Sequence, residues 1–540
     1  MAISRTLVNG SERLRQYQSY RWLVLANIMV GTFISVLDST IVNVGRPKIM
    51  AAFGVSLDKI EWISTAYMLA MAVMLPASGW LADHFGYKRT YFTGLTLFTL
   101  GSLLCGLSWN ENSLIIFRVI QGAGAGLLSP VGMAFITREF PPEQRGMALG
   151  FWGIAAAASI SLGPIVGGYL VDNWSWQSIF TVNVPVGLAG MLATLIIQKE
   201  YKSEVSRAFD LIGFLSMTLF LTFLLIALSE GNADWNVGGW TSQFSINCYT
   251  LSLIGLVIFL YTEFTVENPL IQLRLLKSLS FSGACLASFI FSVVMYGSTL
   301  VGPMYMQSAL GYTAFQSGLV FLPLGIIQGI TSPLAGKLSD KVKPMIPAVL
   351  GMLLMALSMY WNSRLSLDTE NLRIVLLSYI RGLAMGLIFT PLSTMAFSGI
   401  SREKMAQASG IYNVIRQVGG SFGFAITGTV FIRRNIFHTA MISQSVGQLA
   451  KGSSPVFQNL LSNLTYFAKL KGGHPGFSSV IRAQNAVMQA QTIFMSHLAK
   501  QAYVMAINDC YLVIALLSVI GIIPLIISNV YQKLKQNGKP

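Results

Sequence analysis

The 540-residue sequence is poor in charge: only 11% of its residues are Asp, Glu, Lys or Arg, whereas 53% are hydrophobic. Soluble domains contain about 25% charged residues, so this shortage excludes an ordinary soluble domain and a disordered chain. Long stretches of the chain must lie where a charge is too costly to place, which is the hydrocarbon of a bilayer. The sequence therefore predicts a multi-pass membrane protein.

Cysteine and histidine are also scarce, with four of each. The cysteines lie far apart and the histidines show no ligand spacing, so we expect neither a disulfide framework nor a metal site. The G-x-x-x-x-G-K-[ST] pattern that cradles nucleotide phosphates is missing as well. These absences argue against a membrane-embedded enzyme and against an ATP-driven pump, and they predict a protein that needs no cofactor.

The sequence does have long apolar runs, each sufficient to cross a bilayer as a helix. Barrel strands would instead show weak ten-residue alternation, so the predicted class is an all-α membrane protein. Fourteen transmembrane helices are expected, at 22–45, 59–82, 88–107, 113–136, 147–171, 179–197, 211–229, 244–264, 281–302, 315–337, 344–362, 372–396, 405–431 and 506–530.

The distribution of basic residues predicts the orientation of the chain. The formal net charge is +15, and Lys and Arg gather in alternate connections, such as Lys88 and Arg89 after the second run. Because cytoplasmic loops retain Lys and Arg, both termini are expected to be cytoplasmic. The basic surplus is therefore interpreted as a topology signal, and nucleic acid is not expected as a partner.

Two sequence echoes indicate an internal duplication. The segment 79–90 is echoed by 336–343, and 121–130 is echoed by 381–391. Each echo lies eight spans after its partner. If the two spans at 211–229 and 244–264 are an insertion, the chain is a six-plus-six repeat, which is an architecture of secondary transporters. The predicted organisation is an N-terminal six-helix half over 1–197, cytoplasmic linkers and two inserted spans over 198–280, and a C-terminal six-helix half over 281–540 that includes an outer-side loop at 432–505.

Six motifs in the expected order give the chain a family resemblance. They are LDSTIVNV (37–44), GWLADHFGYKR (79–89), RVIQGAGAG (118–126), LGPIVGG (162–168) with WSWQSIFTVNVPVG (174–187), GPMYMQSALGYTAFQSGLVFLPLG (302–325) and SGIYNVIRQVGGSFG (409–423). With these motifs the chain resembles the major facilitator superfamily, and within it the fourteen-helix drug:proton antiporter family of the EmrB/QacA type.

The resemblance implies a major facilitator fold with two six-helix halves and two extra central spans, located in the inner (plasma) membrane of a bacterium. It also implies export of amphipathic drugs or toxic lipophilic compounds by exchange for protons, so that the proton gradient is the driving force and no cofactor is required. A specific exporter of a fatty acid, a metabolite or a siderophore with the same fold is the alternative.

Asp38 is the only carboxylate deep within a predicted span. An Asp at a helix centre costs about 2.5–3.5 kcal/mol on insertion scales, and burial disfavours its charged form, which suits a group that binds and releases a proton. A permanently ionised, structurally paired carboxylate is the alternative. The resemblance places a proton-coupling acid at Asp38.

Three buried arginines accompany this acid in the predicted spans. Arg118 lies in the motif that the family associates with proton coupling, and because a guanidinium keeps its proton, we expect it to tune a carboxylate such as Asp38. Binding of backbone carbonyls is the alternative for Arg118. Arg416 falls within a family motif and is a weaker candidate for coupling, whereas Arg381 is interpreted as snorkelling or bonding to backbone.

By resemblance, two further motifs serve conformational change. The conformational latch between the halves comprises Gly79, Asp83, Gly86, Lys88 and Arg89. The antiporter-motif helix, interpreted as kinked and closely packed because of its proline and small residues, carries Gly163, Pro164, Gly167 and Gly168.

Substrates and partners follow from composition and from the resemblance. The 24 methionines and the aromatic residues suit an adaptable apolar pocket for lipophilic substrates, although most of them must pack the core or face membrane lipid. The candidate cavity residues are Tyr67, Tyr296, Met304, Tyr305 and Asn413. A periplasmic membrane-fusion adaptor, working with an outer-membrane channel, is the expected partner of loop 432–505, with a plain tether as the alternative.

Overall fold

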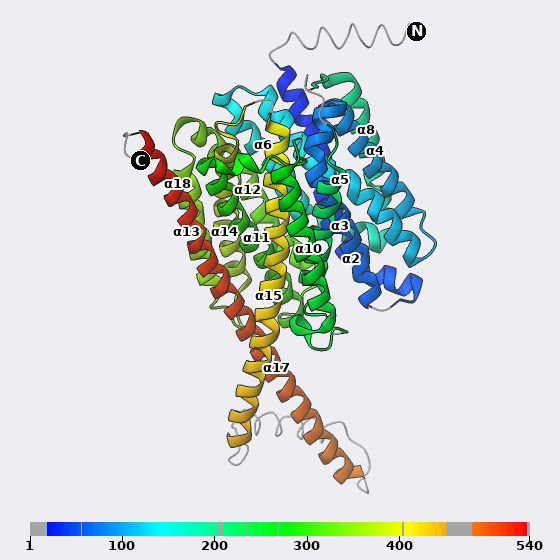
Figure 1. Cartoon of the computed structure of the whole chain (residues 1–540). Helices are drawn as coiled ribbons and strands as arrows, with labels where there is room; N and C mark the ends of the chain where they lie inside the picture. Colours follow the sequence, from blue (N-terminus) through cyan, green and yellow to red (C-terminus); the bar gives the residue numbers. More distant parts are fainter. Residues whose placement is uncertain are drawn as a thin grey trace.

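The computed structural model of the chain describes residues 19–55, 57–202, 208–233, 235–267, 269–401, 404–449 and 478–536. All regular secondary structure in these ranges is helical, which confirms the predicted all-α fold (Figure 1). The N-terminal group of helices consists of α2 (Tyr20–Phe53), α3 (Leu57–Phe85), α4 (Tyr87–Gly106), α5 (Glu111–Glu139), α6 (Pro142–Asn173), α7 (Ser178–Thr181) and α8 (Asn183–Ile197).

A central pair and a C-terminal group complete the bundle. The central pair is α9 (Leu211–Glu230) and α10 (Gln243–Thr265). The short 3-10 helix η1 (Gly239–Thr241) lies between them, and a second one, η2 (Leu273–Lys277), follows α10. The C-terminal group consists of α11 (Leu279–Met304) with the π-helical turn η3 (Tyr305–Ala309), α12 (Ala314–Lys341), α13 (Met345–Asn362), α14 (Asn371–Phe397), α15 (Met405–Leu449), α17 (Ser478–Ile520) and α18 (Ile522–Gln536).

Twelve segments among the described residues are long and apolar enough to cross a membrane. The other two predicted spans, 88–107 and 405–431, are helical as α4 and α15 but do not reach that hydropathy. Their composition explains this, because α4 is rich in threonine and begins with basic residues, and α15 carries arginine, glutamine and many glycines. The multi-pass helical fold is therefore confirmed, whereas the count of fourteen spans is not.

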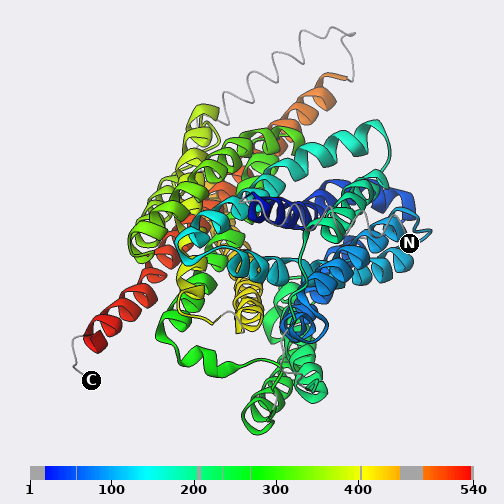
Figure 2. The ribbon, with the colours of Figure 1, turned by 90° about the horizontal axis from the view of Figure 1, so that it is seen from above.

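The two groups repeat one packing scheme. In the N-terminal group α3 and α4 pack on α5, while α2 packs on α6 and α8; in the C-terminal group α12 and α13 pack on α14, while α11 packs on α15 and α17. The helices α2, α3, α4, α5, α6 and α8 therefore correspond in order to α11, α12, α13, α14, α15 and α17. Figure 2 shows the two groups side by side, with the central pair at one edge of the bundle.

Contacts between the groups follow the same correspondence. Helix α6 packs on α12, and α3 packs on α15. Because α6 corresponds to α15 and α3 to α12, the two contacts are equivalent. The central helix α9 contacts both α3 and α15. The described bundle therefore contains two related groups that meet along two related helix pairs.

The ends of the bundle differ in shape. Helix α2 begins and α18 ends on one side, while the extended ends of α15 and α17 project from the opposite side (Figure 1). Within the predicted outer-side segment 432–505, residues 432–449 and 478–505 continue the helices α15 and α17. The stretch 478–505 contains no glycine or proline, so nothing in it breaks a helix. Residues 450–477 lie outside the described residues.

Candidate functional site

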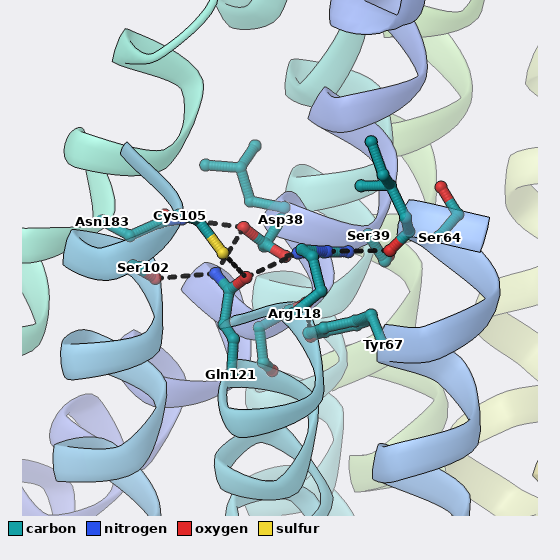
Figure 3. Close-up of polar contacts among 12 residues, drawn as sticks. Asp38, Ser39, Ser64, Tyr67, Ser102, Cys105, Arg118, Gln121 and Asn183 are labelled. Carbon is teal, nitrogen blue, oxygen red and sulfur yellow. Dashed lines mark hydrogen bonds and ion pairs between the residues drawn. The ribbon is translucent and has the colours of Figure 1, made fainter. Parts of the chain in front are cut away.

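Asp38 and Arg118 form a buried ion pair at the centre of the N-terminal group. Asp38 on α2 is 0% exposed and Arg118 on α5 is 1% exposed, and the Nη1 of Arg118 donates to the Oδ2 of Asp38 (Figure 3). A buried charge is tolerated when it is paired and its remaining hydrogen-bonding groups are satisfied. The pair meets the first of these conditions directly.

Neighbouring amides and a hydroxyl meet the second condition. The Nε2 of Gln121 donates to the Oδ1 of Asp38 at 2.8 Å, and the Nδ2 of Asn183 donates to the same oxygen at 3.0 Å. Gln121 also accepts from the Nη1 of Arg118 at 2.6 Å and donates to Ser102 at 2.7 Å. Both carboxylate oxygens therefore accept hydrogen bonds from α5, and one of them also from α8.

The rest of the Arg118 side chain contacts α3. Its Nε donates to the carbonyl of Ile63 at 3.1 Å, and its guanidinium carbon lies 4.0 Å from the centre of the Tyr67 ring. The Tyr67 hydroxyl in turn donates to the carbonyl of Ser35 on α2 at 2.9 Å. Arg118 thus makes both kinds of contact considered for it, with a carboxylate and with a backbone carbonyl, and Tyr67 covers it with a cation–π contact.

The local sequence of α5 explains how this site is built. Arg118 and Gln121 are three residues apart, so they share one face of the helix. A Cβ on Gly122 would lie 2.4 Å from the carbonyl oxygen of Tyr67, and a Cβ on Gly124 would lie 2.4 Å from the backbone nitrogen of Phe98. Only glycine allows α3 and α4 to approach α5 this closely.

Arg416 lies at the contact between the two groups. Its guanidinium carbon is 4.7 Å from the centre of the Phe389 ring, and its Nη1 is 3.5 Å from the Oδ1 of Asn413. The same oxygen accepts from the hydroxyl of Ser129 on α5 at 3.3 Å. Within the described residues no hydrogen bond or ion pair joins Arg416 to Asp38, so the structure does not bring these two expected coupling residues together.

Part of the expected latch joins α3 to α15. A Cβ on Gly79 would lie 3.1 Å from the Cα of Gln407, and the Nε2 of Gln407 is 3.4 Å from the Oδ2 of Asp83. Gly86 follows with a φ of +103°, a backbone conformation that favours glycine. Gly79 and Asp83 therefore lie where the N-terminal group meets the C-terminal group.

The basic residues of the same motif lie elsewhere. The Nζ of Lys88 donates to the carbonyl of Leu195 at 2.7 Å, and the Nε of Arg89 is 3.7 Å from a carboxylate oxygen of Glu200. Glu200 also accepts from the backbone nitrogen of Lys88 at 3.0 Å. These contacts attach the start of α4 to the end of α8 within the N-terminal group.

A second carboxylate occupies the corresponding place on α12. The two oxygens of Asp340 accept from the backbone nitrogens of Gly146 at 2.9 Å and Met147 at 3.1 Å. Gly146 also meets Gly336, because a Cβ on Gly336 would lie 2.0 Å from the carbonyl oxygen of Gly146. Sequence reasoning did not select Asp340, although the echo of 79–90 at 336–343 marks its position.

The antiporter-motif residues place α6 against α2 beside the buried pair. A Cβ on Gly163 would lie 2.1 Å from the Oγ1 of Thr40, and a Cβ on Gly167 would lie 2.8 Å from the Cγ1 of Ile41. Helix α6 continues through Pro164. Gly168 has no atom within 4 Å of a hypothetical Cβ, so the close approach depends on Gly163 and Gly167.

The expected cavity residues occupy several places. Tyr67 belongs to the Asp38 site, and Asn413 lies at the contact between the groups. Tyr305 is buried in the C-terminal group, where its hydroxyl donates to a backbone carbonyl at 2.6 Å. Tyr296 packs edge-on against another aromatic ring at 5.4 Å, and Met304 is the last residue of α11.

A further polar cluster, on α15 and α17, escaped sequence reasoning. Asp509 contacts the Nε of Arg434, and its Oδ2 lies 2.7 Å from the Nε2 of His438. Asp509 falls near the start of the predicted span 506–530, so it was not counted among deeply buried acids. The spacing of Arg434 and His438 by four residues, which puts both on one helix face, is the signal that could have found it.

Comparison with known proteins identifies the family. Residues 28–424 match the family model described as Major Facilitator Superfamily. The chain is 33% identical over 477 residues to the "Probable multidrug resistance protein EmrY" of Escherichia coli (strain K12), covering 88% of this chain and 92% of that protein. It is 32% identical over 437 residues to the "Multidrug export protein EmrB" of the same strain, covering 80% and 84%.

Solved structures agree on the fold. The proton:xylose symporter XylE, a member of the same superfamily, aligns with a TM-score of 0.55 at 13% identity, covering 88% of this chain and 95% of that one. The family model and the relatives above 30% identity show that the chain belongs to the Major Facilitator Superfamily. It is a multi-pass membrane transporter and not a catalytic enzyme, which confirms the family, the fold class and the transport role expected from the sequence.

Proposed function

We propose that this protein exports amphipathic drugs or toxic lipophilic compounds in exchange for protons, across the inner membrane of a bacterium. The relatives named as multidrug export proteins support drugs as the cargo, in preference to a single metabolite, fatty acid or siderophore. The observation that carries proton coupling is the fully buried carboxylate of Asp38 in its ring of hydrogen-bond donors.

The geometry gives protonation of Asp38 a defined consequence. As a carboxylate, Asp38 balances the charge of Arg118 and accepts bonds from Gln121 and Asn183. A proton on Asp38 removes the countercharge of Arg118 and takes up one acceptor position, so the contact between α2 and α5 weakens. Each proton that moves inward supplies about 2.3 kcal/mol per 100 mV of membrane potential, which is available to drive export.

Alternating access would come from rocking of the two helix groups against each other. The contacts of Asp83 with Gln407, and of Asp340 with the start of α6, hold the groups together near the ends of α3 and α12. We place these ends, together with both chain termini, on the cytoplasmic side, since the basic connections lie there. Arg416, at the contact between the groups, would adjust to the rocking motion rather than carry the proton.

Transport in proteoliposomes with an imposed pH gradient tests the coupling. Asp38→Asn is expected to abolish pH-driven uptake of a lipophilic dye while the protein is still produced and purified normally. Asp368→Asn makes the same chemical change at an exposed residue between α13 and α14 and should transport like the parent protein. Normal pH-driven transport by Asp38→Asn would overturn the proposal.

Cysteine labelling tests the latch. The four natural cysteines are buried and unpaired, so a cysteine introduced at Ala406, which is 2% exposed and lies on α15 beside Gly79, can report opening of this end. Replacing Asp83 and Asp340 together by asparagine should speed its labelling in membranes, because the contacts that close this end are weakened. Unchanged labelling would exclude the latch role.

The projecting ends of α15 and α17 are the proposed docking surface for a periplasmic adaptor, which would lead on to an outer-membrane channel. Apolar side chains are exposed there, with Ile436 at 65%, Phe437 at 50% and Met495 at 54%. Ile436→Glu should reduce recovery of a co-expressed adaptor in a pull-down without altering the yield of the transporter. Undiminished recovery would place the docking surface elsewhere.

A further inference from the structure

The C-terminal group has a counterpart of the Asp38 site, at the same height on the equivalent helix. Gln121 lies ten residues after the first residue of α5, and Arg381 lies ten residues after the first residue of α14. A glycine follows each of them. Its role is the same in both groups, because a Cβ on Gly382 would lie 2.5 Å from the carbonyl oxygen of Leu324 on α12, as one on Gly122 would meet α3. The two sites therefore lie on equivalent helices and at the same position along them, and in both a glycine lets the neighbouring helix approach closely.

The two sites differ in charge. Arg381 is 6% exposed, and its Nη2 donates to the Oγ1 of Thr299 on α11 at 3.2 Å. Its Nε is buried without a hydrogen-bond partner, and none of the ion pairs found among the described residues includes it. A guanidinium stays charged in a protein, and an uncompensated buried charge is strongly unfavourable. Something other than these side chains must balance it.

Arg381 lines a small cavity inside the C-terminal group. The cavity is enclosed by side chains from α11 to α14 and from α17, and polar groups of Ser378, Asn362 and Tyr511 border it. Its free space suits a single water molecule or a small ion, and a drug-sized molecule does not fit. The hydroxyl of Ser378 and the amide of Asn362 each donate to a backbone carbonyl of their own helix, at 3.0 Å and 2.8 Å. The hydroxyl of Tyr511 can turn its hydrogen toward an occupant of the cavity. Water would satisfy the orphaned Nε but would leave the charge unbalanced.

We propose that this cavity binds a small monovalent anion, chloride in the cell. The anion accepts from the Nε of Arg381 and from the hydroxyl of Tyr511 on α17. It supplies the negative charge that Asp38 supplies in the N-terminal group, so one group carries a titratable counterion and the other an exchangeable one. This inference is independent of which compound the transporter exports.

Chloride binding by the purified full-length protein in detergent is the test. The parent protein should bind radioactive chloride saturably, and its apparent melting temperature should rise by several degrees when chloride replaces gluconate, since a ligand of the native state stabilises it. Arg381→Gln, which installs the side chain found at Gln121, should lose the binding and the shift. Arg373→Gln, at an exposed position of the same helix, should keep both.

A designed carboxylate makes the test independent of whether Arg381→Gln folds. Thr299→Asp places an acid at the hydroxyl that already contacts Arg381, and so recreates the arrangement of the N-terminal group. This variant should be as stable in gluconate as the parent protein is in chloride, and its melting temperature should not respond to chloride. Absence of saturable binding in the parent protein, binding that survives Arg381→Gln, or an undiminished chloride response of Thr299→Asp would each overturn the proposal.

Discussion

The Asp38 site and the Arg381 site of this transporter lie on equivalent helices, and each has a buried guanidinium whose charge must be balanced. In the N-terminal group Arg118 is balanced by Asp38, and amides of Gln121 and Asn183 fill the remaining acceptor positions. In the C-terminal group Arg381 has a hydroxyl of Thr299 beside it and a small cavity in place of an acid. The duplicated fold therefore preserves helix packing more strictly than it preserves charge.

One site can change its charge with protonation, and the other keeps a fixed charge. A carboxylate can gain and lose a proton, so the balance of charge around Arg118 changes with protonation. The guanidinium of Arg381 cannot change its charge, so its surroundings stay polar in every step of the cycle. The N-terminal group is thus suited to sense protons, and the C-terminal group to act as a fixed counterpart.

Replacement of each arginine by glutamine should give the largest difference between the sites. Arg118→Gln leaves the buried Asp38 carboxylate without its partner, which costs about 3–5 kcal/mol in proteins. Arg381→Gln removes a charge and leaves no buried acid behind, so its loss of stability should be clearly smaller. Denaturant unfolding of both purified variants measures the difference.

A double variant serves as the control for that comparison. Combining Arg118→Gln with Asp38→Asn removes both charges and should recover much of the stability that Arg118→Gln loses. Equal losses of unfolding free energy for Arg118→Gln and Arg381→Gln would mean that leaving Asp38 without its partner carries no extra cost.

Substitution of the glycine beside each site should instead have equal effects. A Cβ at Gly122 would lie 2.4 Å from a backbone oxygen, and one at Gly382 would lie 2.5 Å from another. Backbone cannot turn aside as a side chain can, so Gly122→Ala and Gly382→Ala should each cost about 1–3 kcal/mol through overpacking. Gly168→Ala, whose Cβ would meet no atom within 4 Å, is the control. Clearly unequal losses of stability for Gly122→Ala and Gly382→Ala would show that helix packing does not constrain the two positions equally.

The sequence predicted the parts of this picture that depend on composition and spacing. Scarce charge singled out Asp38 and Arg118, and the helical spacing of the family motifs placed them in spans that the structure brings together. The echo of 121–130 at 381–391 predicted the duplication that relates α5 to α14. These features could be read because each depends on residues close together in the chain or on the cost of charge in a membrane.

Other features required the tertiary structure. Gln121 and Asn183 lie within quoted motifs, but their bonds to one oxygen of Asp38 depend on how α5 and α8 pack on α2. The composition of the outer segment 432–505 indicates helix-like stretches, but only the structure shows that they continue α15 and α17 beyond the rest of the bundle. The sequence predicts that Arg381 snorkels or bonds to backbone, because only the packing of α11 and α17 around α14 shows which side chains face it.

The smallest effects are expected from removing one hydroxyl at each site, and they sharpen the comparison most. Ser102→Ala removes an acceptor of Gln121, and Thr299→Val removes an acceptor of Arg381; a hydrogen bond of this kind contributes about 0.5–1.5 kcal/mol. The countercharge at the first site is covalently attached, so Ser102→Ala should lose the same stability in chloride as in gluconate. At the second site the countercharge can leave, so Thr299→Val should lose more in gluconate than in chloride. Melting curves of both variants in the two salts measure this, and an identical salt response would mean that the two arginines are balanced in the same way.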